Sequence, residues 1–253
     1  MQVTIIVPTY NEAENLPKLV SALFALPLEN LNVLVVDDNS PAGTGRIADE
    51  LAGQHPGRIL VTHRAGKLGL RTAYLEGFQR AIAEGADVVG QMDADFSHDP
   101  AKLVEMVAAL QTADVAFGSR YVPGGSVDVD WPLWRKSLSA FGNFYARTIL
   151  GFPLRDVTTG YRLWRRDAIL GMPLERIQSS GYVFLVEMAY IAWCLKYRVA
   201  QVPIYFADRK FGKSKMSLKI QMEAAFRVWQ VKWNYRDLRA KGEAGRRNLI
   251  PNS

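Results

Sequence analysis

Short apolar runs alternate with amphipathic segments through the first half of the chain, and this alternation limits the possible folds most strongly. The segments between the runs carry apolar residues at helical spacing, as Leu16, Leu19, Val20 and Leu23 do. Strands that alternate with helices predict an α/β fold built on a doubly wound, mostly parallel sheet. The apolar runs that we expect to form its strands are residues 3–8, 31–36, 58–63, 87–92 and 115–118.

The chain has 253 residues, of which 49% are hydrophobic, and this is enough for one large domain with an extensive core. No segment rich in Gly, Ser or Pro divides it. We therefore expect one α/β domain over residues 1–215, an amphipathic helix over residues 216–240, and a disordered basic tail over residues 241–253.

Polar side chains follow three of the expected strands at the point where each strand ends. They are Tyr10 and Glu12, Asp37 and Asp38, and Asp93 and Asp95. In a parallel sheet these ends meet at one edge, which is where open α/β sheets bind ligands. Each residue alone is typical of a loop cap, but together they predict a ligand site. No Gly-x-Gly-x-x-Gly follows the first strand, so the dinucleotide fingerprint is absent.

The carboxylates of Asp93 and Asp95 are one residue apart, and strand alternation would point them the same way. Two carboxylates suit Mg²⁺ or Mn²⁺ when substrate phosphate and water supply the other ligands. The alternative is a polar turn before a helix that opens at Pro100 and has Asp99 as its N-cap. We favour the metal site because the pair stands at a strand end.

The net charge of +6 indicates an anionic partner, such as a nucleotide, a nucleic acid or an acidic lipid. Aromatic and basic residues are interleaved in the expected helices after Arg135 and over residues 218–238, a pattern typical of helices at an anionic membrane surface. Packing on the domain's own core is the alternative. The longest nearly apolar run, residues 183–195, contains Glu187 and is too short to span a bilayer, so we expect a peripheral protein.

Four segments of the chain form an ordered set of motifs. They are Pro-Thr-Tyr-Asn-Glu at 8–12, Val-Val-Asp-Asp-Asn-Ser-Pro at 35–41, Gly-Lys-Leu-Gly-Leu at 66–70 and Met-Asp-Ala-Asp at 92–95. In this order they resemble successive motifs of family 2 glycosyltransferases. The resemblance is to the polyprenyl (dolichyl) phosphate mannose synthases within that family, and it runs from residue 3 to about 216. It implies a GT-A fold that binds a nucleoside-diphosphate sugar through residues 1–118 and an acceptor through residues 119–215.

The resemblance also implies site residues. A basic loop at 208–215 resembles the segment that closes over the donor diphosphate, where Arg209 and Lys215 would neutralise the leaving group. Catalytic roles then fall to Asp95, Arg209 and Lys215, and Ser97 stands where some relatives have a third metal ligand. The implied donor-binding residues are Pro8, Tyr10, Glu12, Asp37, Asp38, Lys67, Asp93, Ala94, Asp95, Arg209 and Lys215.

On the acceptor side, Arg120 and Arg135 match the family's arginines that hold the lipid phosphate. Candidate sugar-site residues are Asp156, Gly160, Arg162 and Glu187. For Glu187 a partnered core carboxylate is the alternative, and we favour the sugar ligand because an unpaired buried carboxylate is costly. Arg71 and Ala42 depart from the family pattern.

The expected function is an inverting, metal-dependent transfer of a hexose to a polyprenyl or dolichyl phosphate at the cytoplasmic membrane surface. GDP-mannose is the favoured donor and UDP-glucose the alternative. A separate membrane subunit is a further candidate partner, and no nucleic acid is expected. Hypotheses from other classes are a haloacid dehalogenase-type phosphotransferase, since Asp-Ala-Asp-Phe-Ser at 93–97 mimics its nucleophile loop, and a non-enzymatic membrane-surface adaptor.

Overall fold

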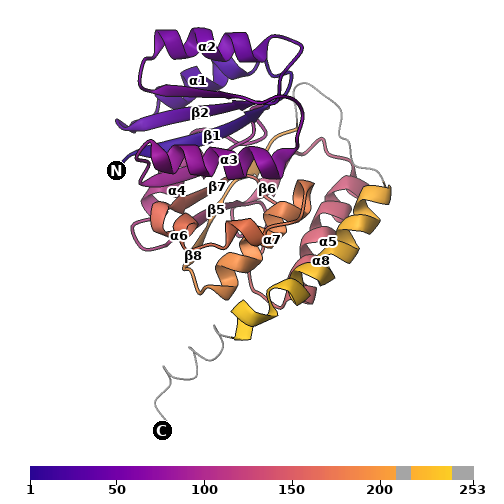
Figure 1. The fold of residues 1–253 in the computed structure, drawn as a ribbon. Helices are drawn as coiled ribbons and strands as arrows, with labels where there is room; N and C mark the ends of the chain where they lie inside the picture. Colours follow the sequence, from indigo (N-terminus) through magenta and orange to yellow (C-terminus); the bar gives the residue numbers. More distant parts are fainter. Residues whose placement is uncertain (209–217, 241–253) are drawn as a thin grey trace.

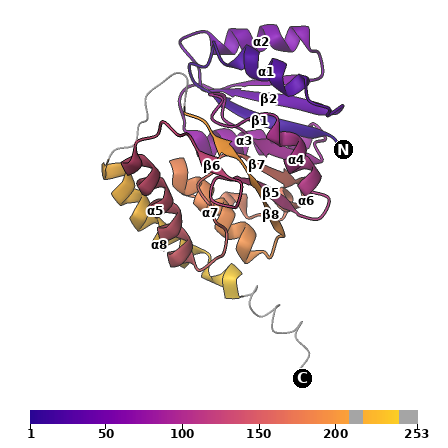
Figure 2. The same ribbon diagram turned by 180° about the vertical axis from the view of Figure 1, so that it is seen from behind.

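The computed structural model describes residues 1–208 and 218–240, in which helices cover both faces of a central sheet (Figures 1 and 2). The sheet has the strand order β3-β2-β1-β4-β7-β5-β8. Its strands are β1 (Val3–Thr9), β2 (Leu31–Asp37), β3 (Ile59–His63), β4 (Val88–Gln91), β5 (Val115–Ser119), β7 (Arg162–Arg165) and β8 (Val199–Pro203). The predicted doubly wound, mostly parallel α/β fold is confirmed.

Strand β7 is the exception, because it runs antiparallel to both of its neighbours, β4 and β5. The sequence did not reveal it, since only four residues form the strand and two of them are arginines. Its position matters for function, because the chain enters β7 from the same edge at which β1, β2 and β4 end.

Helices divide between the two faces of the sheet and build two cores. On one face, α1 (Leu16–Phe24), α2 (Thr44–Gln54) and α4 (Lys102–Ala109) pack on the strands. On the other lie α3 (Leu70–Ala83), α5 (Leu133–Leu150), α6 (Arg166–Leu170), α7 (Gly181–Cys194) and α8 (Leu218–Asn234). A single 3-10 turn, Leu174–Arg176, precedes α7.

Two local predictions need correction. Strand β1 does not stop at Pro8 but continues to Thr9, with Pro8 opposite Val36 of β2. Pairing with β4 ends at Ile6, so the missing N–H of Pro8 falls where β4 no longer runs beside β1. Helix α4 begins at Lys102 rather than Pro100.

A second, two-stranded sheet of β6 (Ser126–Val127) and β9 (Tyr205–Phe206) lies over the carboxyl edge of the main sheet. A bridge between His98 and Phe206 and a hydrogen bond from Ala207 N to Ser97 O (3.2 Å) attach β9 to the segment after β4. This attachment brings the second half of the chain onto the predicted ligand edge.

Candidate active site

The carboxyl ends of β1 and β2 meet through hydrogen bonds to the buried side chain of Asp37. Its carboxylate accepts hydrogen bonds from Thr9 Oγ1 (2.9 Å), Ser40 Oγ (2.6 Å) and Ser40 N (3.0 Å). Asp38 N donates to Thr9 O (3.0 Å). Through these hydrogen bonds Asp37 fixes the conformation of the loop after β2. A direct contact between Asp37 and the donor remains a prediction.

Asp38 is paired with Arg64, a residue that the sequence reading missed. Arg64 Nη1 lies 2.5 Å from Asp38 Oδ1, and both side chains are buried. Burial raises the pKa of Asp38, and the Arg64 guanidinium opposes that rise. Arg64 directly follows β3, so its place at the end of a third neighbouring strand was the available signal.

Tyr10 and Lys67 come together at this edge, where the Lys67 Nζ lies 3.6 Å from the centroid of the Tyr10 ring. Both side chains are exposed. The backbone N of Glu12 donates to Thr44 Oγ1 (3.0 Å), and its carboxylate accepts from Asn15 Nδ2 (2.8 Å). The exposed cation and ring can meet an anionic, aromatic ligand such as a nucleotide.

Asp93 and Asp95 lie in a tight turn after β4 rather than in the strand, so strand alternation does not set the directions of their side chains. Phe96 adopts φ of 59°, and the turn is closed by hydrogen bonds from Ser97 N to Asp95 Oδ1 (3.0 Å) and from Asp93 N to His98 Nδ1 (3.4 Å). His98 is fully buried and stacks on Tyr161, its ring centroid 5.1 Å away. His98 therefore holds the backbone at Asp93 in place from the interior.

The loop before β7 closes over the same turn. A Cβ added to Gly160 would lie 3.6 Å from both carboxylate oxygens of Asp93. Gly160 therefore lets the loop approach the carboxylate without a side chain between them. The two motifs are 67 positions apart in the sequence and adjacent in space.

The donor set of this turn fits a divalent cation that is completed by substrate. Within residues 1–208 and 218–240, no group of three or more His, Cys, Asp and Glu side chains could enclose a metal by itself. Mg²⁺ and Mn²⁺ commonly use one or two carboxylates plus phosphate and water.

The Ser97 hydroxyl is buried without a hydrogen-bond partner in the described part of the chain, and its role as third ligand stays a prediction. The Ala94 methyl group packs into the core, leaving its backbone for any donor contact.

Arg120 forms a buried ion pair with Asp156. Its Nε and Nη2 donate to the two carboxylate oxygens at 2.7 and 2.8 Å, and Nη2 also donates to Thr158 Oγ1 (2.7 Å). Burial opposes ionisation of Asp156, but the Arg120 guanidinium outweighs burial and holds the pKa of Asp156 below its usual range. Asp156 thus holds Arg120 in position, and neither side chain is open to solvent.

Two of the predicted sugar-site residues hold the scaffold instead. Arg162 is fully buried, and its guanidinium donates to the carbonyls of Thr159 (3.0 Å), Leu185 (2.7 Å) and Val157 (2.8 Å). It supports the loop from the interior rather than facing a sugar. The sequence does not distinguish a charged residue that binds a ligand from one that supports the scaffold, because both can stand in a glycine-containing motif.

Glu187 is the partnered core carboxylate that was the alternative interpretation. It accepts hydrogen bonds from Ser179 N (2.8 Å) and from the hydroxyl of Tyr235 (3.0 Å), and both Glu187 and Tyr235 are buried. These partners support the alternative interpretation, and a contact of Glu187 with sugar stays a prediction. The carboxylate instead joins α7 to the segment that follows α8.

Arg135 lies on the same aromatic cluster as Arg120. Its guanidinium carbon is 3.7 Å from the ring centroid of Trp131, whose edge meets Phe206 at 5.7 Å, and Arg120 lies 5.2 Å from the Phe206 ring. Arg135 Nη1 also pairs with Asp208 Oδ1 at 2.9 Å. Phe206 contacts His98, so both arginines adjoin the turn that carries Asp93. Arg209 and Lys215 lie outside the described residues.

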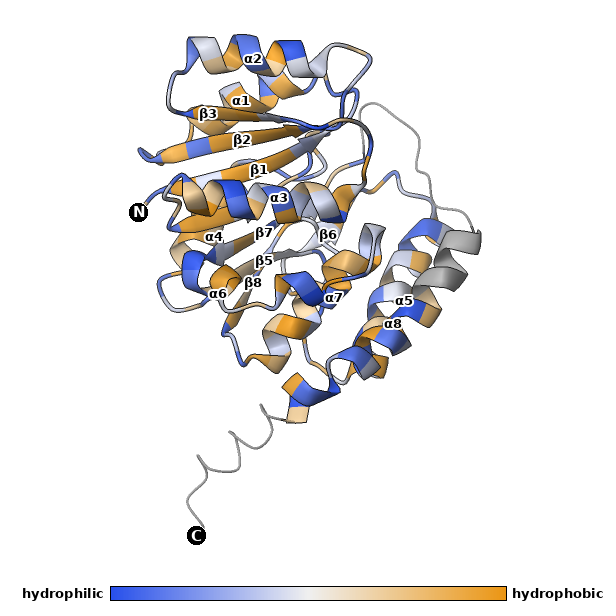
Figure 3. Cartoon of the chain, viewed as in Figure 1, coloured by the Kyte–Doolittle hydropathy of each residue, from blue (hydrophilic) through white to orange (hydrophobic). Residues whose placement is uncertain are grey.

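Helices α5 and α8 pack side by side (Figures 1 and 3), and both carry exposed aromatic residues. Trp229 Nε1 donates to Tyr145 Oη (3.0 Å), which in turn donates to Ala225 O (3.2 Å). Tyr235, Val228 and Val231 face the core. The exposed aromatic and aliphatic residues of these two helices are Leu133, Trp134, Phe141, Phe144, Phe226, Trp229 and Trp233.

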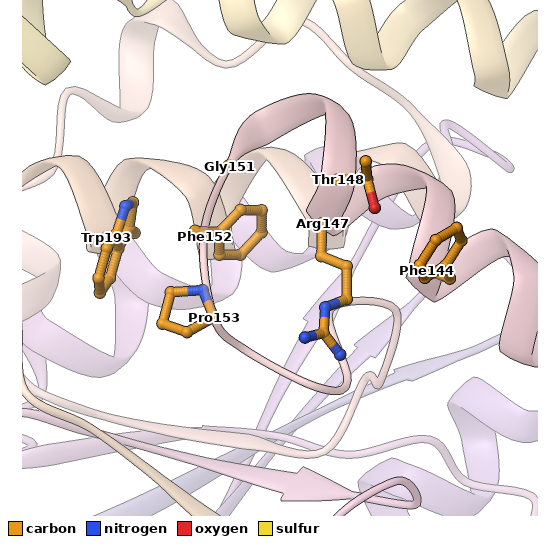
Figure 4. A pocket seen from close by; sticks show the side chains of 7 residues that line it. All are labelled: Phe144, Arg147, Thr148, Gly151, Phe152, Pro153 and Trp193. Atoms are coloured by element: carbon orange, nitrogen blue, oxygen red, sulfur yellow. The ribbon is translucent and has the colours of Figure 1, made fainter.

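A shallow pocket of about 480 Å³ lies at the end of α5, between Arg147, the turn after it and Trp193 of α7 (Figure 4). None of the residues that line it was predicted to bind substrate. Among the helices of residues 1–208 and 218–240, none has the length and apolarity needed to cross a bilayer.

A mostly parallel sheet with an acidic turn at its carboxyl edge agrees with the GT-A fold that the sequence motifs imply. Residues 4–170 match the family described as "Glycosyl transferase family 2". The chain belongs to this family and is an enzyme of the glycosyltransferase class. The haloacid dehalogenase hypothesis and the adaptor hypothesis are therefore set aside, and Asp93 follows the fourth strand rather than the first.

Two bacterial relatives cover nearly the whole chain. "Polyprenol monophosphomannose synthase" from Mycolicibacterium smegmatis is 44% identical over 234 residues, which is 92% of this chain and 86% of the relative. "Undecaprenyl-phosphate mannosyltransferase" from Micrococcus luteus is 44% identical over 243 residues, 95% of this chain and 99% of the relative.

Solved structures of glucosyl-3-phosphoglycerate synthase from Mycobacterium tuberculosis share the fold. The complex with UDP gives a TM-score of 0.61 at 16% identity and covers 91% of this chain and 78% of that one. The complex with Mn²⁺, UDP and phosphoglyceric acid gives 0.62 at 15% identity, covering 91% and 76%.

Proposed function

We propose that this enzyme transfers mannose from GDP-mannose to a polyprenyl phosphate, with Mg²⁺ or Mn²⁺ as cofactor, at the cytoplasmic face of a membrane. The observation that carries the proposal is the 44% identity to two proteins named for mannosyl transfer to polyprenyl carriers. Those alignments extend through both halves of the chain, so they include the arginines of the second half as well as the acidic turn.

The donor would lie across the edge formed by Tyr10, Lys67 and the acidic turn. Asp93 and Asp95 would hold the cation, and a bound cation would neutralise the diphosphate as the sugar leaves. Arg209 and Lys215 are proposed, from sequence, to add positive charge to the leaving nucleotide. Gly160 leaves the space beside Asp93 that a diphosphate-linked sugar needs.

The acceptor phosphate is ionised at neutral pH, so no general base is required. One of its oxygens would attack the anomeric carbon in line, forming the new C–O bond while the bond to the β-phosphate of GDP breaks, with inversion at that carbon. This agrees with the position of His98, which is buried and accepts the N–H of Asp93 through Nδ1. Arg135 would bind the acceptor phosphate, and Arg120 would position the loop beside it.

The surface of α5 and α8 would bring the enzyme to its lipid. Its exposed aromatic side chains carry adjacent cations: Arg236 lies 4.3 Å from the ring centroid of Trp233, and Lys232 lies 5.5 Å from that of Trp229. Rings beside cations suit an anionic headgroup region. A membrane subunit that covers this surface is the alternative partner.

A donor panel tests the proposal. The full chain is assayed with one short polyprenyl phosphate, a divalent cation and GDP-mannose, GDP-glucose, UDP-glucose or UDP-galactose in turn. We expect GDP-mannose to give the highest kcat/KM. A preference for UDP-glucose would overturn the donor assignment but leave the acceptor class intact. No transfer to the lipid from any donor would overturn the acceptor class.

A further inference from the structure

The two arginines on the aromatic cluster differ in how firmly they are held. Arg120 is tied to Asp156 by two hydrogen bonds in the interior, where removal of a partner leaves a buried charge. Arg135 is tied to Asp208 by one hydrogen bond, and these side chains are 26% and 46% exposed. Water can replace either partner of such an exposed pair at little cost. Of the two arginines, Arg135 is therefore the one whose paired carboxylate can be replaced by another anion.

The surroundings of Arg135 keep its guanidinium in place while its partner changes. The guanidinium carbon lies 3.7 Å from the centroid of the buried Trp131 ring, and this contact holds the group whichever anion its N–H donors bind. The backbone of Asp208 is held separately, by a hydrogen bond from its N to Asp128 Oδ2 (2.8 Å). Rotation of the Asp208 side chain away from Arg135, with its backbone in place, would open the position on Arg135.

We propose that Asp208 occupies on Arg135 the position that the acceptor phosphate takes, and thereby sets the apparent affinity for the acceptor. The inference rests on the proposed function, since it needs a phosphate acceptor at Arg135. A carboxylate and a phosphate offer oxygens that pair with a guanidinium in the same way. The phosphate carries more charge and replaces the carboxylate, which then remains nearby as a like charge.

The test compares acceptor KM for the parent, Asp208→Asn and Asp130→Asn. Asp208→Asn removes the competing charge, and we expect the acceptor KM to fall about two- to fivefold, the range for an exposed ion pair. Donor affinity measured by calorimetry should not change. Asp130 is an exposed carboxylate beside Trp131, so Asp130→Asn is the matched control for a lost charge and should leave the acceptor KM within about 1.5-fold.

The Arg135→Gln background separates exchange from general repulsion. If Asp208 acts through Arg135, Asp208→Asn should not lower the acceptor KM in Arg135→Gln. Three results would each overturn the inference. The acceptor KM could fall equally in the parent and Arg135→Gln backgrounds, or it could fall as much in Asp130→Asn as in Asp208→Asn. It could also rise or stay constant in Asp208→Asn. Failure of the proposed function looks different, because the parent itself would then transfer nothing to the polyprenyl phosphate.

Discussion

The edge formed by β1, β2 and β4 and the loop over residues 156–162 both carry motif residues, but they use charge differently. At the edge, Tyr10 and Lys67 are exposed and Asp93 is half-buried, so each can reach a substrate. In the loop, Asp156 and Arg162 are fully buried and bind other parts of the protein. The edge therefore supplies groups that contact ligand, while the loop supplies the scaffold that holds its glycine against Asp93. Variants should separate these two uses of charge.

The largest effect is expected at the edge. Asp95→Ala should lower turnover about a thousandfold, because the acidic turn loses half of its carboxylates for the cation. The melting temperature should change far less than turnover, since the hydrogen bond that Asp95 accepts from Ser97 N lies within its own turn. Steady-state assays and thermal unfolding measure the two effects. Full turnover of the parent in excess EDTA would contradict the metal role.

The loop should show the opposite pattern. Asp156→Ala leaves Arg120 buried without its carboxylate, and the free energy of unfolding should fall by about 3–5 kcal/mol. Lys67→Ala, at the exposed edge, should change it by less than about 0.5 kcal/mol. Urea unfolding compares the two variants. Similar stabilities would mean that the buried pair is not what holds the loop.

Arg135→Ala should act on the acceptor alone. Loss of a charge-assisted hydrogen bond is expected to raise the acceptor KM about ten- to thirtyfold. Donor affinity and stability should be unchanged, because Arg135 is exposed and far less constrained than Arg120. Calorimetry with GDP is the control measurement. An equal loss of donor and acceptor affinity would remove Arg135 from the acceptor site.

The smallest effect concerns the exposed aromatic residues of α8. Replacing both Trp229 and Trp233 by Ser should weaken binding to vesicles of phosphatidylcholine and phosphatidylglycerol about tenfold, as measured by flotation. Folding should be retained, since both side chains are at least half exposed, and circular dichroism checks this. Val228→Ser is the contrasting variant, because Val228 faces the core and its loss should lower stability. If the double variant floats like the parent, the membrane contact lies on α5 or on a partner.

The strand ends were predictable from sequence because each follows an apolar run whose period and length are clear. The positions of Asp37 and Asp93 on one edge follow from the parallel order. Lys67 was placed there only by the resemblance of its motif. The roles of Arg162 and Glu187 were not predictable, since a buried charge with good partners and a ligand-binding charge have the same local sequence. Their partners, such as the carbonyl of Leu185 and the hydroxyl of Tyr235, are known only once the helices are packed. Strand β7 was missed for a related reason, because its pairing partners lie far away in the chain.

The central claim is that the turn after β4 binds the donor diphosphate through a divalent cation. Calorimetric titration of GDP into the parent and into Asp95→Asn, with Mn²⁺ and then with excess EDTA, tests it most directly. The parent should bind GDP at least about tenfold more weakly in EDTA, and Asp95→Asn should bind equally weakly in both conditions. If the parent binds GDP with the same affinity with and without the cation, the acidic turn is not the metal site.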